Sequence, residues 1–204
     1  MQDSKQQLEQ GLHPAMNDAV PRRQGTLSVS IGNFVLKTLG WKVAGQLPEK
    51  KKFILAVAPH TSNWDFIVGF SVMLAIDLRT HFMGKNSIFV WPIKGLLTRM
   101  GGIPIYRDKT NGVVQQMVAH CNNSESFVLG LAPEGTRSKT KEWKSGFIHI
   151  AHQANIPIVP VSLHFDTKEV KFHPPMNISA DTEAELQRVK QRFDGACAKI
   201  KQAV

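Results

Sequence analysis

The sequence predicts a single-domain α/β protein with a mostly parallel central sheet flanked by helices. Short apolar runs alternate along the chain with stretches of helical periodicity, which is the pattern of repeated strand and helix units. The chain has 204 residues and a hydrophobic share of 42%, which suits one domain with an ordinary globular core. Polar residues interrupt every long apolar stretch, so we expect no transmembrane helix.

We expect residues 1–25 to form a mobile tail, because they are polar with mixed charges and lack the order of a secretory signal. Residues 26–204 are then the folded domain. Residues 26–43 carry apolar side chains at nearly helical spacing, and two interpretations are open for them. They form a helix packed in the core, or an interfacial helix that anchors the protein to a membrane, with Trp41 near its end between two lysines.

The other elements follow from apolar runs, helical periodicity and turn residues. Strands are expected at residues 53–58, 80–85, 101–107, 126–132, 156–164 and 169–173. Helices are expected at residues 64–79, 87–100, 110–122, 144–154 and 182–204.

The formal net charge of +9 attracts phosphate groups, whether on nucleic acid, on a coenzyme or on an anionic lipid. Cys121 and Cys197 show no Cys-x-x-Cys spacing, which favours a reduced cytosolic protein without a structural metal. His149 and His152 can share a helix face, but no His-Glu-x-x-His motif accompanies them. We therefore expect no metal site.

A histidine and an aspartate lie at a predicted junction between strand and helix. His60 follows the strand at residues 53–58, and Asp65 lies five residues later, in the first turn of the next helix. A histidine whose ring is held by a carboxylate can take a proton from a hydroxyl near neutral pH. Ser62 and Asp65 also fit a capping box, in which they satisfy backbone N–H groups. Both interpretations remain open.

A second polar cluster follows the strand at residues 126–132. It contains Glu134, Gly135, Thr136 and Arg137. A glycine turn with free backbone N–H groups, a hydroxyl and a guanidinium suits a small anion such as phosphate. The alternative is an exposed turn with a solvated arginine.

Arg107 ends another predicted strand, where it is either a surface residue or well placed for a second phosphate contact. In open parallel sheets the functional loops collect at the carboxyl ends of the strands. We therefore expect His60, Arg107 and the turn at residues 134–137 to converge on one cleft.

Four blocks, taken in order, resemble the glycerolphospholipid acyltransferase family, which contains the 1-acylglycerol-3-phosphate acyltransferases. They are His60-x4-Asp65 and residues 101–107, 133–138 and 156–161, and the resemblance spans residues 52–163. Pro59 and Ala132 stand where this family usually has a polar residue and a phenylalanine.

The resemblance implies that His60 is the general base, that Asp65 orients it, and that Arg107 with residues 134–137 binds the acceptor's phosphate. It implies a lysophospholipid acceptor such as 1-acylglycerol-3-phosphate, with acyl-CoA or acyl-carrier protein as co-substrate and no cofactor. We expect direct attack on the thioester, because the sequence has no Gly-x-Ser-x-Gly elbow for a nucleophilic serine.

Net charge favours an anionic membrane surface as a partner, so we expect a cytoplasmic protein associated with the inner face of the membrane. Two other functions remain as alternatives, a lipid-binding protein without catalytic activity and a basic nucleic-acid-binding domain. The tryptophans are scattered rather than interleaved with basic runs, so no nucleic-acid partner is expected.

Overall fold

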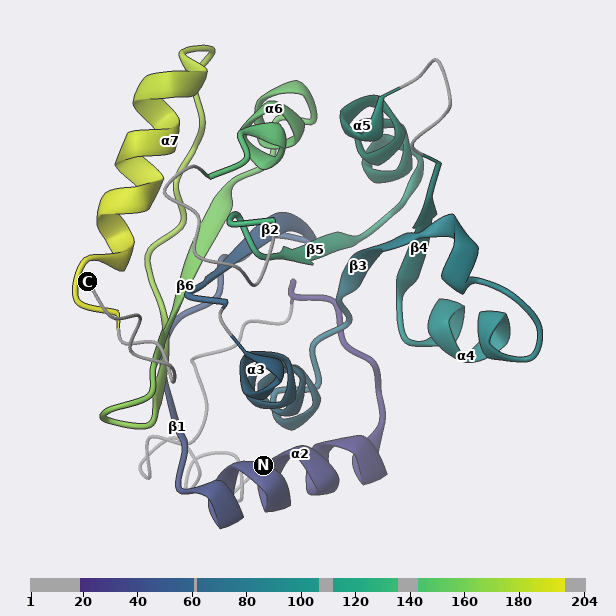
Figure 1. Cartoon of the computed structure of the whole chain (residues 1–204), viewed down its shortest axis with the longest axis vertical. Helices are drawn as coiled ribbons and strands as arrows, with labels where there is room; N and C mark the ends of the chain where they lie inside the picture. The colour runs from purple at the N-terminus through teal and green to yellow at the C-terminus, as the bar shows by residue number, and fades with distance from the viewer. Residues whose placement is uncertain (1–18, 61, 107–111, 136–142, 197–204) are drawn as a thin grey trace.

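In the computed structural model, which describes residues 19–60, 62–106, 112–135 and 143–196, helices cover both faces of one central sheet (Figure 1). Within these residues the sheet has seven strands in the order β1-β7-β6-β2-β5-β3-β4. The strands are β1 (Lys42–Gly45), β2 (Lys52–Ala58), β3 (His81–Lys85), β4 (Gly102–Ile105), β5 (Phe127–Leu131), β6 (Ile158–His164) and β7 (Glu169–Phe172). The α-helices are α2 (Thr26–Leu39), α3 (Asn63–Ala75), α4 (Ile93–Arg99), α5 (Val113–Asn123), α6 (Gly146–Gln153) and α7 (Thr182–Lys190).

The predicted mostly parallel sheet is confirmed. Five strands run in one direction, namely β6, β2, β5, β3 and β4. Strand β7 pairs antiparallel with β6, and β1 pairs parallel with β7 at the edge of the sheet. In the register of the central strands, Ala56 lies opposite Leu131 of β5, and Ala58 lies opposite Ser162 of β6. The segments that leave β2, β3, β4 and β5 therefore start from the same edge of the sheet.

The core lies on both faces of the sheet, because successive side chains of a strand point to opposite sides. Helices α2 and α3 lie on one side of β2, and α5, α6 and α7 lie on the other (Figure 1). Phe53 and Leu55 belong to the core cluster of the first side, whereas Ile54 and Ala56 belong to that of the second. All four side chains are fully buried. The apolar composition of β2 thus comes from its central position between two helix layers.

The region predicted as one helix over residues 26–43 contains a helix and a strand. Helix α2 ends at Leu39, where Gly40 adopts a left-handed backbone with φ of 73°, and β1 follows. Trp41 is only 6% exposed, and its ring packs edge-on against Phe165 with 4.8 Å between the ring centroids. Trp41 is therefore part of the core and does not have the place that the interfacial interpretation gave it.

Helix α2 packs closely against α3 through Gly32. A Cβ atom at this position would lie 2.7 Å from the carbonyl oxygen of Ser71, so only glycine fits without displacing the helix. Leu36 is fully buried on the same side, whereas Leu27 and Phe34 are exposed on the other. The interpretation as a core-packing helix therefore holds for one side of α2. The other side is apolar and exposed.

The segment at residues 19–25 corrects the predicted end of the tail. Val20 is buried in the core, and Arg22 forms a β-bridge with Leu78. The backbone N–H groups of Gln24 and Gly25 donate to the Asp77 carboxylate at 3.2 Å each. The folded domain therefore begins before residue 26, and the rest of the predicted tail, residues 1–18, lies outside the described residues.

Several other predicted boundaries shift. Helix α3 ends at Ala75 rather than at residue 79, because the following residues pair with the segment at residues 19–25. The short 3₁₀ helix Asn86–Ile88 precedes α4, which begins only after Pro92. Helix α7 ends at Lys190 and continues as the 3₁₀ turn Gln191–Phe193, and residues 197–204 lie outside the described residues.

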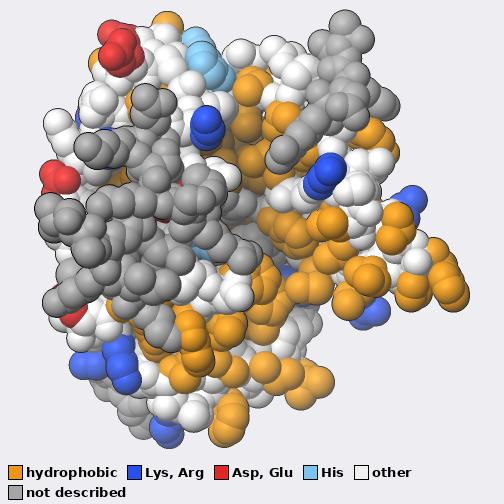
Figure 2. All heavy atoms as spheres, in the orientation of Figure 1, with side chains coloured by type: hydrophobic (Ala, Val, Ile, Leu, Met, Phe, Trp, Pro, Cys, Tyr) orange, Lys and Arg blue, Asp and Glu red, His pale blue; other side chains and the backbone are white. Residues whose placement is uncertain are grey.

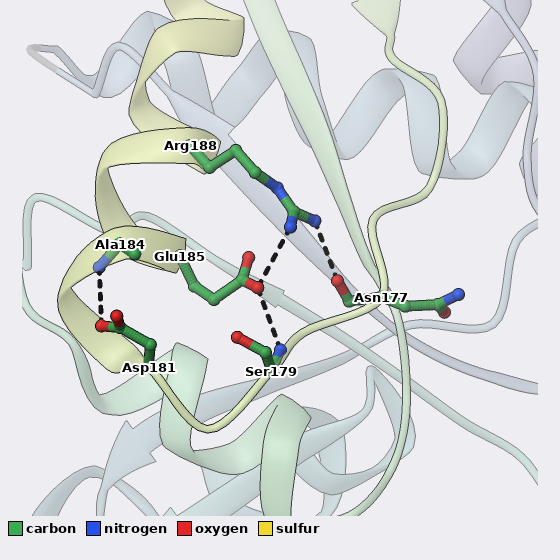
Figure 3. A network of polar contacts seen from close by, with 6 residues as sticks. All are labelled: Asn177, Ser179, Asp181, Ala184, Glu185 and Arg188. Atoms are coloured by element: carbon green, nitrogen blue, oxygen red, sulfur yellow. Dashed lines mark hydrogen bonds and ion pairs between the residues drawn. The ribbon is translucent and has the colours of Figure 1, made fainter.

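A polar network fixes the start of α7 (Figure 3). The Asp181 carboxylate caps the helix by accepting from the Ala184 N–H at 3.1 Å. Buried Glu185 accepts from the Ser179 N–H at 3.0 Å and from the Arg188 guanidinium at 3.1 Å, and Arg188 also donates to the Asn177 carbonyl at 2.9 Å. One carboxylate thereby ties the helix to the segment before it.

We expect Glu185→Ala to lower the free energy of unfolding by about 1–3 kcal/mol, because the Ser179 N–H and the Arg188 guanidinium lose their shared acceptor, which is itself buried. Urea denaturation followed by circular dichroism measures this change. Glu183→Ala, at an exposed position of the same helix, is the matched control and should stay within about 0.5 kcal/mol of the unsubstituted protein. Equal effects of the two substitutions would contradict the assigned role of Glu185.

Candidate active site

The local sequence explains why His60 lies at the carboxyl edge of the sheet. Strand β2 ends at Ala58, and α3 begins at Asn63 with Ser62 as an extended N-cap residue. The intervening loop is too short to leave that edge, so His60 stands directly above the strand. Asp65 is at the third position of the helix, where its side chain reaches back toward the loop.

The capping role considered for Asp65 is confirmed, and the carboxylate also lies near His60, whose orientation by Asp65 stays a prediction. Its side chain is 1% exposed and accepts from the Ser62 N–H at 2.6 Å, while the Ser62 side chain accepts from the Asp65 backbone N–H, which completes the capping box. The Ser62 hydroxyl also donates to the Asp65 carboxylate at 3.0 Å. The same carboxylate lies 3.6 Å from Nδ1 of His60, measured to Oδ2. This separation is longer than a hydrogen bond, so the two side chains are close neighbours without a direct hydrogen bond between these atoms.

Glu134 contacts the backbone of His60. The His60 N–H donates to Oε1 of Glu134 at 3.1 Å, which links the loop after β2 to the loop after β5. Burial raises the pKa of Glu134, and the nearby charge of Asp65 adds to this, while the contacts with His60 act in the opposite direction. Glu134 therefore holds the loop that carries His60, and its predicted role in phosphate binding stays a prediction.

We expect Glu134→Ala to reduce turnover by about tenfold to a hundredfold, because the loop that carries His60 loses its anchor. Glu134→Gln keeps an oxygen acceptor and should retain most of the activity. The raised pKa means that the stability Glu134 contributes is largest below its unfolded pKa and is lost as the pH rises through its folded pKa. The Gln variant should lack this pH dependence in thermal unfolding. Similar kinetics of the Ala and Gln variants would contradict the role of the acceptor.

The turn after β5 differs from its predicted form in one respect. Gly135 has a left-handed backbone with φ of 66°, as the predicted glycine turn requires, but its N–H donates to the Ala132 carbonyl at 3.1 Å. This amide is therefore not free for an anion. Arg107, Thr136 and Arg137 lie outside the described residues, so their predicted contacts with phosphate stay predictions.

A cleft of about 440 Å³ lies next to His60 at the carboxyl edge, a size within the usual range for ligand pockets. Its walls come mainly from the ends of β3, β4 and β5. The lining residues are His60, Phe82, Met83, Gly84, Lys85, Ile105, Val113, Gly130, Leu131, Ala132 and Gly135. The cleft thus combines the histidine and a lysine with apolar side chains such as Phe82 and Met83.

Lys85 is a cation of this cleft that the sequence analysis did not name. It is the last residue of β3, and β3 was predicted to end there. The rule that polar groups at the carboxyl ends of parallel strands share one site would have found it. Within the described ranges, no group of three histidine, cysteine or carboxylate side chains is placed to hold a metal ion.

Comparison with known proteins identifies the family. A family model described as acyltransferase matches residues 41–164, a range that contains the His60-x4-Asp65 motif and the glycine turn. The chain belongs to the acyltransferase family. The resemblance found in the sequence is thereby confirmed.

Curated relatives of this acyltransferase-family chain are named 1-acyl-sn-glycerol-3-phosphate acyltransferase. The protein from Haemophilus influenzae is 28% identical over 132 residues, which are 60% of this chain and 53% of the relative. The protein from Limnanthes douglasii is 30% identical over 169 residues, which are 72% of this chain and 59% of the relative. The aligned part therefore spans a little over half of the length of these relatives.

The structural comparison supports the fold. The crystal structure of the 1-acyl-sn-glycerophosphate acyltransferase PlsC from Thermotoga maritima superposes with a TM-score of 0.56 and 20% sequence identity. The superposition covers 85% of this chain and 80% of the other. The α/β architecture predicted for an acyltransferase-like chain is therefore confirmed.

Proposed function

We propose that this protein transfers a fatty acyl group from a thioester to a hydroxyl group of a lysophospholipid, with 1-acylglycerol-3-phosphate as the first candidate acceptor. The observation that carries the proposal is the pair of His60 and Asp65 beside the apolar cleft, with Nδ1 and Oδ2 3.6 Å apart. The names of the relatives support the same reaction and the same acceptor.

In the proposed mechanism His60 acts as a general base through Nε2, the ring nitrogen remote from Asp65. The imidazole takes the proton of the acceptor hydroxyl, and the oxygen attacks the thioester carbonyl carbon. The resulting tetrahedral intermediate collapses with cleavage of the carbon–sulfur bond, and the imidazolium returns the proton to the thiolate. Buried Asp65 stabilises the imidazolium during this cycle. No acyl-enzyme forms.

The donor is proposed to be acyl-CoA or acyl-carrier protein, because a thioester supplies a thiolate leaving group without any cofactor. Lys85 in the cleft, together with Arg107, Thr136 and Arg137, is proposed to attract the acceptor's phosphate. Guanidinium and ammonium groups bind phosphate through charge-assisted hydrogen bonds. An acceptor with a phosphomonoester should then be used in preference to one without.

We further propose that the protein meets its lipid substrate as a peripheral protein on the inner face of an anionic membrane. Exposed apolar side chains gather on the side of the molecule where α2, α3 and α4 lie (Figure 2). They include Leu27, Ile31, Phe34, Trp64, Phe66, Ile67, Val90, Trp91, Ile93 and Leu96. A continuous apolar surface of this kind on a basic protein is typical of interfacial binding.

No helix in the described ranges has both the length and the apolar character needed to cross a bilayer. The exposed apolar side chains therefore carry the proposed contact with lipid. Trp91, which is 91% exposed between the 3₁₀ helix and α4, is the most prominent of them.

A substrate panel tests the proposal. The purified protein is incubated with palmitoyl-CoA or, separately, with palmitoyl-acyl-carrier protein as donor. The acceptors are lysophosphatidate, other lysophospholipids and monoacylglycerol, and the products are identified and quantified by mass spectrometry. We expect acylation of lysophosphatidate and much slower acylation of monoacylglycerol, which lacks the phosphate. Equal use of the two acceptors would contradict the phosphate site, and no product from any acceptor would contradict the acyltransferase activity.

A further inference from the structure

A second cavity lies at the opposite edge of the sheet from the catalytic cleft. It encloses about 930 Å³ and is lined at the amino ends of three strands by His81 of β3, Gly102 of β4 and Ser126 before β5. The catalytic cleft is lined at the carboxyl ends of the same strands. The two sites therefore open at opposite edges of the sheet and share no lining residue.

Four arginines line this second cavity, which we call the arginine cavity: Arg22, Arg23, Arg79 and Arg99. The first three are brought together by the segment at residues 19–25, because Arg22 bridges to Leu78 and the Arg79 N–H donates to the Pro21 carbonyl at 2.9 Å. Arg99 comes from the last turn of α4. Distant parts of the chain thus converge on one positive site.

The carboxylates near the arginine cavity are already engaged. Glu125 lines it but pairs with Lys51, at 2.8 Å between Oε1 and Nζ. The Asp77 carboxylate accepts the N–H groups of Gln24 and Gly25. Within the described parts of the chain, none of the four guanidiniums has an ion pair with a carboxylate. The cavity therefore concentrates positive charge that an anion would neutralise.

Two histidines complete the wall. The rings of His81 and His120 meet edge to face, with 5.8 Å between their centroids, and Nδ1 of His81 is buried without a hydrogen-bond partner among the described residues. Burial lowers the pKa of both histidines, and the charges of His120 and Arg79 lower that of His81 further. A bound anion would oppose these effects, because a negative charge nearby raises the pKa of a histidine.

We propose that the arginine cavity binds a phosphate-bearing anion at a site separate from the catalytic cleft. Guanidiniums form bidentate, charge-assisted hydrogen bonds with phosphate oxygens, and four of them suit a doubly charged group better than a carboxylate. This inference does not depend on the proposed function, because it uses none of the residues of the catalytic cleft.

Two sources could supply the phosphate. Leu27 lines the arginine cavity and is 73% exposed on the apolar side of α2, so a bilayer that contacts α2 would place lipid head groups at the cavity. A soluble phosphorylated molecule would carry the same chemistry. The experiment below distinguishes the two.

Methionine methyl groups report on the two sites separately. Met100 lines the arginine cavity, and Met83 lines the catalytic cleft. The full chain labelled with ¹³C at the methionine methyl groups is titrated with inorganic pyrophosphate and followed by NMR. We expect a saturable shift of the Met100 signal. Absence of any change at Met100 over the titration would overturn the proposal.

A matched pair of double variants locates the binding. Arg79→Gln with Arg99→Gln removes two charges from the cavity, and Lys37→Gln with Lys94→Gln removes two from exposed positions of α2 and α4 outside it. We expect the first pair to raise the Kd of pyrophosphate, measured from the Met100 signal, by about tenfold or more. The second pair should leave this Kd nearly unchanged. Equal weakening by both pairs would show a general charge effect and overturn the site. Circular dichroism confirms that each variant is folded.

Vesicles of phosphatidylcholine with and without phosphatidate distinguish the sources. If phosphatidate vesicles displace pyrophosphate, and the arginine variant binds these vesicles more weakly, the natural ligand is a lipid head group. Pyrophosphate binding that such vesicles do not displace identifies a soluble phosphate. Both outcomes support the site, and it fails if the arginine variant binds pyrophosphate as tightly as the unsubstituted protein.

Discussion

Replacement of His60 by alanine is expected to lower the rate of acyl transfer by about 10²–10⁴, the usual contribution of general base catalysis. The acceptor hydroxyl would have to lose its proton to water, and the leaving thiolate would have no acid beside it. The side chain of His60 is 24% exposed at the end of β2, so its removal should leave the fold intact. Initial rates of product formation and thermal unfolding measure the two effects.

His152→Ala is the control for this substitution, because His152 is an exposed histidine of α6 that does not line the cleft. It should keep full activity. Substantial transfer by the folded His60→Ala protein would remove His60 from the mechanism, whereas a loss of thermal stability in that variant would show that the lost activity reflects misfolding.

Asp65→Asn is expected to lower kcat by about 10-fold to 10⁴-fold, with a small change in KM. Asparagine retains an oxygen acceptor for the Ser62 N–H, so the helix cap persists, but the negative charge that stabilises the His60 imidazolium is lost. The size of this effect separates the catalytic role of Asp65 from its structural one. Steady-state kinetics with varied acceptor concentration provide the measurement.

Ser62→Ala is the matched control, since it removes the hydroxyl that donates to Asp65 at 3.0 Å and leaves the carboxylate beside His60. It should cost about 0.5–2 kcal/mol of stability, as cap losses do, with little loss of kcat. If Asp65→Asn loses stability but not kcat, Asp65 is a capping residue only.

The sequence could predict the central strands and the loop of His60 because each depends on local signals. Strand β2 is a continuous apolar run, as a strand buried on both faces must be, and Ser62 with Asp65 marks the start of α3. Strand β1 was missed because Trp41 and Val43 continue the apolar pattern of the preceding helix. Gly40 was the available signal, since glycine commonly ends a helix in the left-handed conformation.

The site was predictable in part for the same reason. The spacing of His60 and Asp65 is local, whereas the contact of Glu134 with the His60 N–H depends on β2 pairing directly with β5, which no local pattern reveals. The arginine cavity likewise depends on the segment at residues 19–25 folding back on Leu78. This segment is polar and is held mainly by backbone hydrogen bonds, so its side chains show no apolar periodicity from which its position could be predicted.

Acceptor-dependent release of the thiol is the most direct test of the central claim, that this chain transfers acyl groups straight from a thioester to a lipid hydroxyl. With palmitoyl-CoA alone, we predict almost no thiol release, and on addition of lysophosphatidate we predict one thiol for each acylated product. No acceptor-dependent release, with vesicle or nucleic-acid binding in its place, would contradict the claim. Such a result would assign this acyltransferase fold a binding role.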